Sequence, residues 1–121
     1  MPRISGLGPD YFVTGQIGVE DVADIAAQGF KTIVNNRPDG EGGAVQPKSS
    51  DLEAEAERHG LVYLHLPMES MAVDPRLANE FSQTLAMSPG PVIGFCRTGA
   101  RASALYYAST RGHGDQLRDL P

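Results

Sequence analysis

The uncharged run PVIGF, at residues 91–95, constrains the fold more than any other segment of the chain. A strand with no charge on either face is typical of the centre of a parallel sheet, where both faces are covered. Three other short, largely apolar runs precede it, at 11–13, 31–35 and 61–66. Segments with helical periodicity separate these runs, so we predict an α/β fold with a mainly parallel sheet of about four to five strands flanked by helices.

The helices are predicted from apolar residues that recur three or four positions apart. They are expected at 18–28, at 49–59, from Pro75 to the break at 88–90, and from Ala102 onward. Asp74 precedes the third of these segments and is expected to be its N-cap, because a carboxylate there can accept from the free amides of the first turn.

The size and composition of the chain favour one core. It has 121 residues, of which 40% are hydrophobic, and we expect a single domain over 1–121. No stretch approaches the roughly twenty apolar residues that span a bilayer, and the first segment lacks a secretory signal. We therefore expect a cytoplasmic protein without membrane insertion. The net charge of −5 disfavours nucleic acid as a partner, because phosphate backbones are bound by basic patches.

The chain has a single cysteine, Cys96, so no disulfide can form within it. His59, His65 and His113 have no zinc-ligand spacing, so we expect no metal, and nothing indicates a cofactor. An isolated cysteine is most often a small buried apolar residue. However, Cys96 directly follows the run at 91–95, and ligands in open α/β sheets bind at the carboxyl ends of strands.

The segment CRTGAR, at 96–101, has the features of an anion-binding loop. Gly99 lets the backbone turn sharply, so that successive amides can point at one centre, and the following helix adds its positive end. Arg101 can present two parallel N–H donors to an oxyanion. The same field favours the thiolate of Cys96, which we predict to be a nucleophile. The predicted anion-binding residues of the loop are Arg97, Thr98, Gly99 and Ala100.

This loop resembles the active-site loops of cysteine phosphatases, including dual-specificity types, and of rhodanese-like sulfurtransferases. The segments TGQ at 14–16, GFKTIVNNRPDGE at 29–41 and QP at 46–47 resemble the DUF442 family. That family is the phosphatase-like domain found alone, or joined to a metallo-β-lactamase-fold dioxygenase in the β-lactamase hydrolase-like proteins. It is often linked with sulfide:quinone reductase. The resemblance covers nearly the whole chain and implies a dual-specificity-phosphatase-like fold.

The spacing within the loop departs from the phosphatase pattern. Phosphatase loops place five residues between cysteine and arginine, whereas four separate Cys96 from Arg101, and Phe95 stands where phosphatases usually carry histidine. This spacing resembles that of a rhodanese, whose smaller ring of amides suits the terminal sulfur of a persulfide. We therefore expect a sulfurtransferase, in which Cys96 takes sulfane sulfur from thiosulfate or a persulfide and passes it to a thiol or cyanide. The resemblance makes sulfide:quinone reductase or a persulfide dioxygenase an expected partner.

Two alternatives stay open. In a cysteine phosphatase, Cys96 would form a phosphocysteine and a carboxylate would protonate the leaving group. Asp39 is the first candidate for this acid, Glu41 and Asp74 are others, and Glu69 has no evident structural role. In a non-catalytic domain, the same face would bind an anion or a partner protein.

Arg37 and Ser103 complete the predicted site. Arg37 could hold the loop of Asp39 by an ion pair, or supply a second cation for an anionic substrate. Ser103 could donate to the sulfur of Cys96, although a hydrogen bond that caps the helix would explain it equally well. His65, in a predicted strand, is expected to be structural.

Overall fold

Strand β5 lies in the middle of a five-stranded sheet, and all of its residues are buried, as its lack of charge predicts. The structure is a computed structural model that describes residues 2–118, with side chains described as far as residue 110. The strand order is β1-β2-β5-β3-β4, and only the pair of β1 with β2 is antiparallel. The strands are β1 (Ser5–Gly6), β2 (Tyr11–Thr14), β3 (Thr32–Asn35), β4 (Val62–His65) and β5 (Val92–Phe95).

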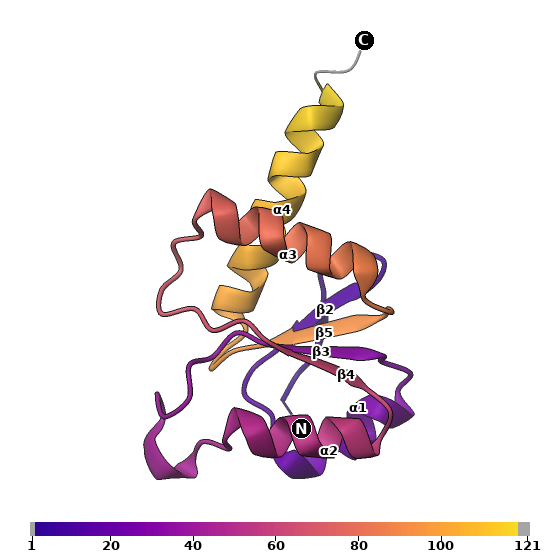
Figure 1. Ribbon diagram of the computed structural model, residues 1–121, viewed down its shortest axis with the longest axis vertical. Helices are drawn as coiled ribbons and strands as arrows, with labels where there is room; N and C mark the ends of the chain where they lie inside the picture. Colours follow the sequence, from indigo (N-terminus) through magenta and orange to yellow (C-terminus); the bar gives the residue numbers. More distant parts are fainter. Residues whose placement is uncertain (1, 119–121) are drawn as a thin grey trace.

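Helices cover both faces of this sheet (Figure 1). Helices α1 and α2 lie on one face, and α3 and α4 lie on the other. None of the helices in the described part of the chain combines the length and the apolar character needed to cross a bilayer. The helices are α1 (Val22–Ala27), α2 (Ser49–Arg58), α3 (Pro75–Met87) and α4 (Ala100–Arg118), with 3-10 turns η1 (Val19–Asp21) and η2 (Gly43–Val45).

Alternate residues of β5 join two separate hydrophobic clusters. Ile93 and Phe95 belong to the cluster under α1 and α2, with residues such as Ile25 and Leu52. Val92 belongs to the cluster under α3 and α4, and so does Cys96, which follows the strand; Phe81 and Leu105 complete that cluster. The central strand therefore sets the side of the sheet on which the cysteine lies.

The structure differs from the sequence predictions at element ends. Helix α4 begins at Ala100 rather than Ala102, because the turn at Gly99 already starts it. Strand β1 was not predicted, because two residues are too few to show the alternation of apolar and polar side chains that marks a strand. The predicted N-cap is confirmed: the Asp74 carboxylate accepts from the amides of Arg76 (2.6 Å) and Leu77 (3.4 Å).

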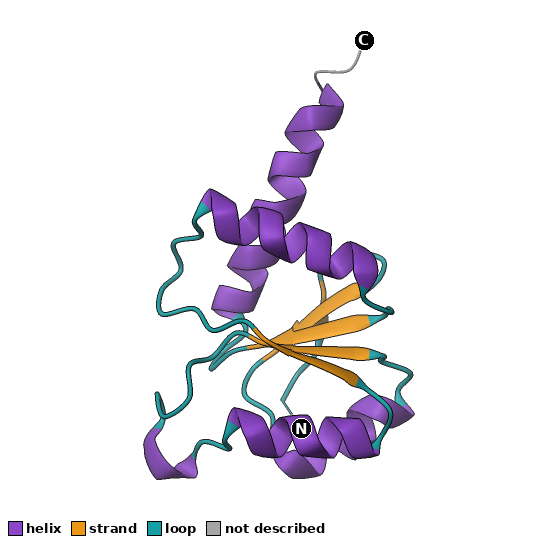
Figure 2. Ribbon diagram, viewed as in Figure 1, coloured by secondary structure: helices purple, strands orange, loops and turns teal. Residues whose placement is uncertain are grey.

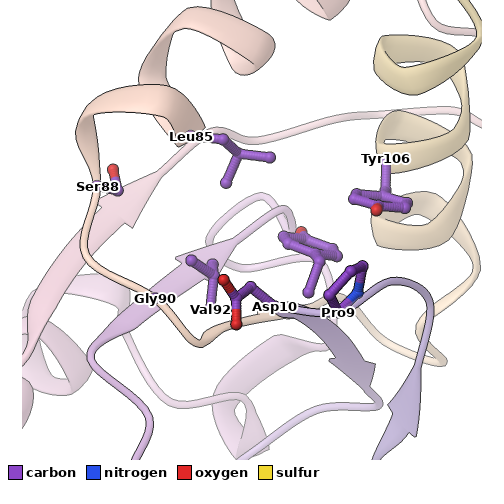
Figure 3. Close-up of a pocket in the computed structure, with 8 residues that line it drawn as sticks. Pro9, Asp10, Leu85, Ser88, Gly90, Val92 and Tyr106 are labelled. Carbon is purple, nitrogen blue, oxygen red and sulfur yellow. The ribbon is translucent and has the colours of Figure 1, made fainter. Parts of the chain in front are cut away.

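The loops that follow β3, β4 and β5 meet at the carboxyl edge of the sheet (Figure 2). The strand register places Asn35 beside both Phe95 and His65, so the residues just after them are neighbours too. A separate pocket, shown in Figure 3, surrounds the start of β5 and includes Asp10 and Val92. It lies at the opposite end of the strand from Cys96.

Candidate active site

Cys96 is buried under the turn that joins β5 to α4, with 1% of its surface exposed. The amide of Gly99 donates a hydrogen bond to its sulfur, with N and Sγ 3.1 Å apart. Gly99 has a φ of +93°, and a Cβ there would lie 3.3 Å from the carbonyl oxygen of Thr14. The backbone can therefore fold back over the sulfur only because this residue is glycine.

The segment after β2 supports the cysteine loop from outside. The amide of Gln16 donates to the carbonyl of Arg97 (3.2 Å), and a Cβ on Gly15 would lie 3.1 Å from that same oxygen. The side chains of Arg97 and Thr98 are exposed. The hydroxyl of Thr98 accepts from the amide of Ala100 (3.3 Å), so it stabilises the turn.

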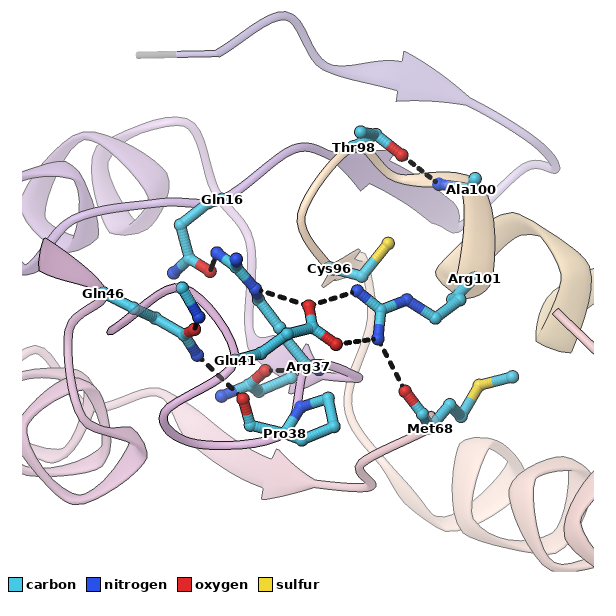
Figure 4. A network of polar contacts seen from close by, with 12 residues as sticks. Gln16, Arg37, Pro38, Glu41, Gln46, Met68, Cys96, Thr98, Ala100 and Arg101 are labelled. Atoms are coloured by element: carbon cyan, nitrogen blue, oxygen red, sulfur yellow. Dashed lines mark hydrogen bonds and ion pairs between the residues drawn. The ribbon is translucent and has the colours of Figure 1, made fainter. Parts of the chain in front are cut away.

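Arg101 connects three segments of the chain (Figure 4). Its Nη1 and Nη2 atoms donate to the two carboxylate oxygens of Glu41, at 2.7 and 2.6 Å. Nη1 also donates to the carbonyl of Met68, at 2.7 Å. Glu41 and the Met68 carbonyl thus occupy the Nη end of the guanidinium. The Nε atom has no hydrogen-bond partner among residues 2–110. The hydrogen bond to Glu41, more than the nearby Cys96, raises the pKa of Arg101.

A second arginine holds the same carboxylate. Arg37 is 7% exposed, and its Nε donates to Glu41 Oε1 at 2.8 Å. Its Nη1 donates to Gln16 Oε1 at 3.0 Å, and its carbonyl oxygen lies 2.9 Å from Nε2 of His65. Hydrogen bonds from Arg101, and then from Arg37, lower the pKa of Glu41 to about 2. Glu41 is therefore an anion fixed between two cations at any working pH.

The loop that carries Glu41 is held by its own hydrogen bonds. Gln46 donates to the carbonyl of Pro38 (2.9 Å) and accepts from the amide of Gly42 (2.7 Å). The carboxylate of Asp39 accepts from the amide of Ser49 (2.8 Å), the first residue of α2. Asp39 thus caps a helix and does not pair with Arg37. Its predicted role as an acid stays a prediction.

The remaining predicted residues have structural contacts. Ser103 donates to the carbonyl of Gly99 (2.8 Å), which is the helix contact rather than the contact with Cys96. Asp74 caps α3. Among the described residues, no group of three histidine, cysteine, aspartate or glutamate side chains could hold a metal ion. The structure thus brings together Cys96, Gly99 and Arg101, with Glu41 and Arg37 behind the arginine.

Sequence reasoning missed the residues that support this site. Gln16, Gln46 and the carbonyl of Met68 each hold a member of it, yet none carries reactive chemistry. A signal for two of them was present, because Gln16 and Gln46 lie in the TGQ and QP segments of the family resemblance.

Residues 4–112 match the family described as beta-lactamase hydrolase-like protein, phosphatase-like domain. The chain belongs to this family. It is 35% identical over 94 residues to a beta-lactamase hydrolase-like protein of Agrobacterium fabrum (strain C58), a match that covers 78% of this chain and 22% of that protein. It is 31% identical over 117 residues to one of Xylella fastidiosa (strain 9a5c), covering 97% of this chain and 27% of that protein. The chain spans about a quarter of the length of these relatives.

Solved structures of phosphatase-like proteins share the fold. One from Neisseria meningitidis, described as a putative phosphatase, has a TM-score of 0.78 and 28% identity, covering 96% of this chain and 78% of that one. A DUF442 protein of Shewanella putrefaciens has a TM-score of 0.77 and 17% identity, covering 93% and 72%. Kinase-associated phosphatase has a TM-score of 0.60 and 17% identity, covering 91% and 74%. The predicted cysteine-phosphatase-like fold is confirmed.

The prediction of a sulfurtransferase is wrong. The family and the Neisseria meningitidis structure, which is described as a putative phosphatase, support an enzyme of the phosphatase-like class instead. The prediction used the spacing of four residues between Cys96 and Arg101, and it assumed that the length of the loop alone determines the position of the guanidinium. In the structure its place is fixed by Glu41 and by the carbonyl of Met68, which belong to other loops. The spacing is therefore a weak guide to the chemistry.

We expect the carboxyl of Glu41 to titrate near pH 2 rather than near its ordinary 4.5. Because the pKa of Glu41 is lowered, its contacts with Arg101 and Arg37 stabilise the fold fully above pH 4.5. This contribution is lost as the pH falls through about 2. Carbon-13 NMR of the Glu41 carboxyl against pH measures the midpoint. R101K should raise it, since Arg101 is the largest cause, whereas R58K, far from this pair, should not. A midpoint near 4.5 in the unaltered protein contradicts the ion-pair account.

Proposed function

We propose that this chain is a cysteine-dependent phosphatase that hydrolyses phosphate monoesters. The observation that carries the proposal is the convergence of donors on one buried sulfur: the Gly99 amide contacts Sγ, and Arg101 is held beside it. Such donors favour a thiolate and would bind the oxygens of a phosphoryl group. Membership of a phosphatase-like family supports the same chemistry.

Aryl phosphates are the substrates that we propose to test first. The phosphatase TpbA of Pseudomonas aeruginosa, solved in complex with phosphotyrosine, shares the fold at a TM-score of 0.58, 18% identity and 79% coverage of this chain. That likeness supports the fold alone. Phosphotyrosine therefore serves as a probe of activity for this chain. It does not identify the phosphate ester that the protein hydrolyses in the cell.

In the first step the thiolate of Cys96 attacks phosphorus. A bond forms between Sγ and phosphorus while the bond from phosphorus to the ester oxygen breaks, and the leaving oxygen takes a proton from a carboxylic acid. The loop amides and the free Nε edge of Arg101 stabilise the equatorial oxygens in the transition state. The phosphoryl group is then carried as a phosphocysteine.

In the second step water attacks the phosphocysteine. The same carboxyl group, now ionised, takes a proton from the water as its oxygen bonds to phosphorus. The bond between phosphorus and Sγ breaks, inorganic phosphate leaves, and Cys96 returns as a thiolate. No metal or cofactor is required for this sequence of bond changes.

Glu41 positions the arginine in this mechanism. Both of its oxygens face the Nη atoms of Arg101, so the Nε edge is the one directed away from the pair. A planar guanidinium held at its far end and at the Met68 carbonyl has little freedom to rotate. Arg101 is thus pre-organised for an oxyanion before substrate arrives.

Glu69 is the acid that we propose. Asp39 and Asp74 both accept hydrogen bonds at the first turns of helices, and Glu41, with a pKa of about 2, holds no proton to give. Glu69 is exposed and directly follows Met68, whose carbonyl contacts Arg101. Glu69 is therefore the candidate carboxyl that is next in sequence to a residue of the site and that has no hydrogen bond or ion pair in the described part of the chain.

The covalent step is tested by trapping. With an aryl phosphate, we expect a pre-steady-state burst of the phenol equal to the enzyme concentration. Acid-quenched protein should carry one phosphoryl group on Cys96, located by mass spectrometry of the digested chain. C96S should show neither the burst nor the adduct. Hydrolysis that persists in C96S, or a chain that binds phosphate without any adduct, contradicts the proposed function.

The proposed role of Glu69 as the acid is tested by comparing substrates whose leaving groups differ in basicity. E69Q should lower kcat for phenyl phosphate by about 10²-fold or more, because its phenoxide leaving group is basic enough to need a proton. For 4-nitrophenyl phosphate, whose leaving group is stable without a proton, the loss should be much smaller. The matched controls are D39N, D74N and E80Q, the last of them at an exposed position of α3, and they should show no such dependence on the leaving group. If D39N shows it and E69Q does not, the acid is Asp39.

A further inference from the structure

Tyr11, in β2, has a hydroxyl that no part of the mechanism above uses. The residue is 3% exposed, and its hydroxyl has no hydrogen-bond partner among the described residues. A buried donor without a partner is unfavourable, and native structures seldom keep one without a role. The position of this hydroxyl points to such a role.

The hydroxyl lies on the same face of the sheet as Cys96, at the side-chain position that precedes the cysteine on that face. Tyr11 pairs with Val92 in the strand register, and both belong to the cluster that contains Cys96. A Cβ on Gly94 would collide with the hydroxyl oxygen of Tyr11. Since residues 94 and 96 share a face, the hydroxyl occupies the side-chain position next to Cys96 along β5. This contact also explains a glycine within an otherwise bulky central strand.

Two aromatic rings hold Tyr11 in this place. Its ring stacks on Tyr106 of α4, with centroids 4.6 Å apart and an angle of 7° between the planes. It meets Phe81 of α3 edge-on, at 5.7 Å and 86°. Tyr11 also lines the pocket of Figure 3, together with Tyr106 and Leu85. The ring is therefore fixed, and the hydroxyl proton is the part that is free to turn.

Tyr11 is also the suitable donor among the unpaired buried groups. Two other buried side-chain atoms lack a partner in the described part of the chain, Thr14 Oγ1 and Asn36 Oδ1. Thr14 follows the strand alternation onto the opposite face, and Oδ1 of an amide can only accept. Burial first, and then the negative charge of Cys96, raise the pKa of Tyr11, so its hydroxyl keeps the proton that it would donate.

We propose that Tyr11 is a positioning residue for the nucleophile, whose O–H dipole turns toward the sulfur of Cys96 as the thiol loses its proton. The Gly99 amide donates to the sulfur from the loop, and the Tyr11 hydroxyl supports it from within the core. This inference rests on the proposed function, because it requires Cys96 to act as a thiolate.

Other charged or titratable groups of the Arg101 network and of the cluster around Tyr11 come from several elements, and the test must separate them from Tyr11. Helix α3 presents the apolar residues Phe81, Leu77 and Leu85 to this cluster. The groups are Arg37 and Glu41 after β3, His65 of β4, and Arg101 and Tyr106 of α4.

The variant Y11F removes the hydroxyl and keeps the ring. The rate of alkylation of Cys96 by iodoacetamide is measured against pH. We expect the Y11F profile to move to higher pH, with about a tenfold lower rate on its acid limb and an unchanged plateau. Y106F is the matched control, since its hydroxyl lies beside Gly8 rather than Gly94, and its profile should overlay that of the unaltered protein.

Thermal unfolding separates this role from a structural one. Because Y11F removes an unpaired buried hydroxyl, its melting temperature should be equal or higher while its cysteine becomes less reactive on the acid limb. Overlaid profiles for Y11F and the unaltered protein overturn the inference, and so does an equal shift in Y106F. The proposed function fails separately, if the unaltered protein forms no phosphocysteine.

Discussion

The carboxylate of Glu41, bound between Arg101 and Arg37, is the interaction on which the site depends. It joins the loop after β3 to the start of α4, and Arg101 extends the connection to the loop after β4 through the Met68 carbonyl. Three segments that are distant in sequence therefore meet at one guanidinium. The side chains of both arginines are largely buried, and each partner makes several hydrogen bonds, so the geometry of these contacts is better defined than that of a surface ion pair.

The rest of the fold supplies rigid backing for this pair. The sheet register brings the ends of β3, β4 and β5 together, and hydrogen bonds from Gln46 and Gln16 hold the loop and the second arginine. The central strand has two constraints of its own. It carries no charge because both faces are covered, and it carries Gly94 because the hydroxyl of Tyr11 takes the space of a side chain.

The sequence was enough to predict those elements that are determined by residues within or next to the element itself. The central position of β5 follows from its composition, the start of α3 from Asp74, and the turn over Cys96 from Gly99. The partners of Arg101 and Asp39 could not be predicted, because they depend on how loops far apart in sequence meet. Glu41 rather than Asp39 reaches the arginine, and Asp39 caps α2 instead. The chemistry was misjudged for the same reason, since the spacing of Cys96 and Arg101 was considered without the partners that fix the guanidinium.

A crystal structure with bound vanadate, an analogue of the transferring phosphoryl group, is the sharpest test of an Arg101 that Glu41 holds ready for an oxyanion. We expect vanadium above the sulfur of Cys96, with its oxygens within hydrogen-bond distance of the Gly99 amide and Arg101 Nε. Glu41 should still bind both Nη atoms. Vanadate bound elsewhere, or an Arg101 that has left Glu41 and turned to solvent, would contradict it.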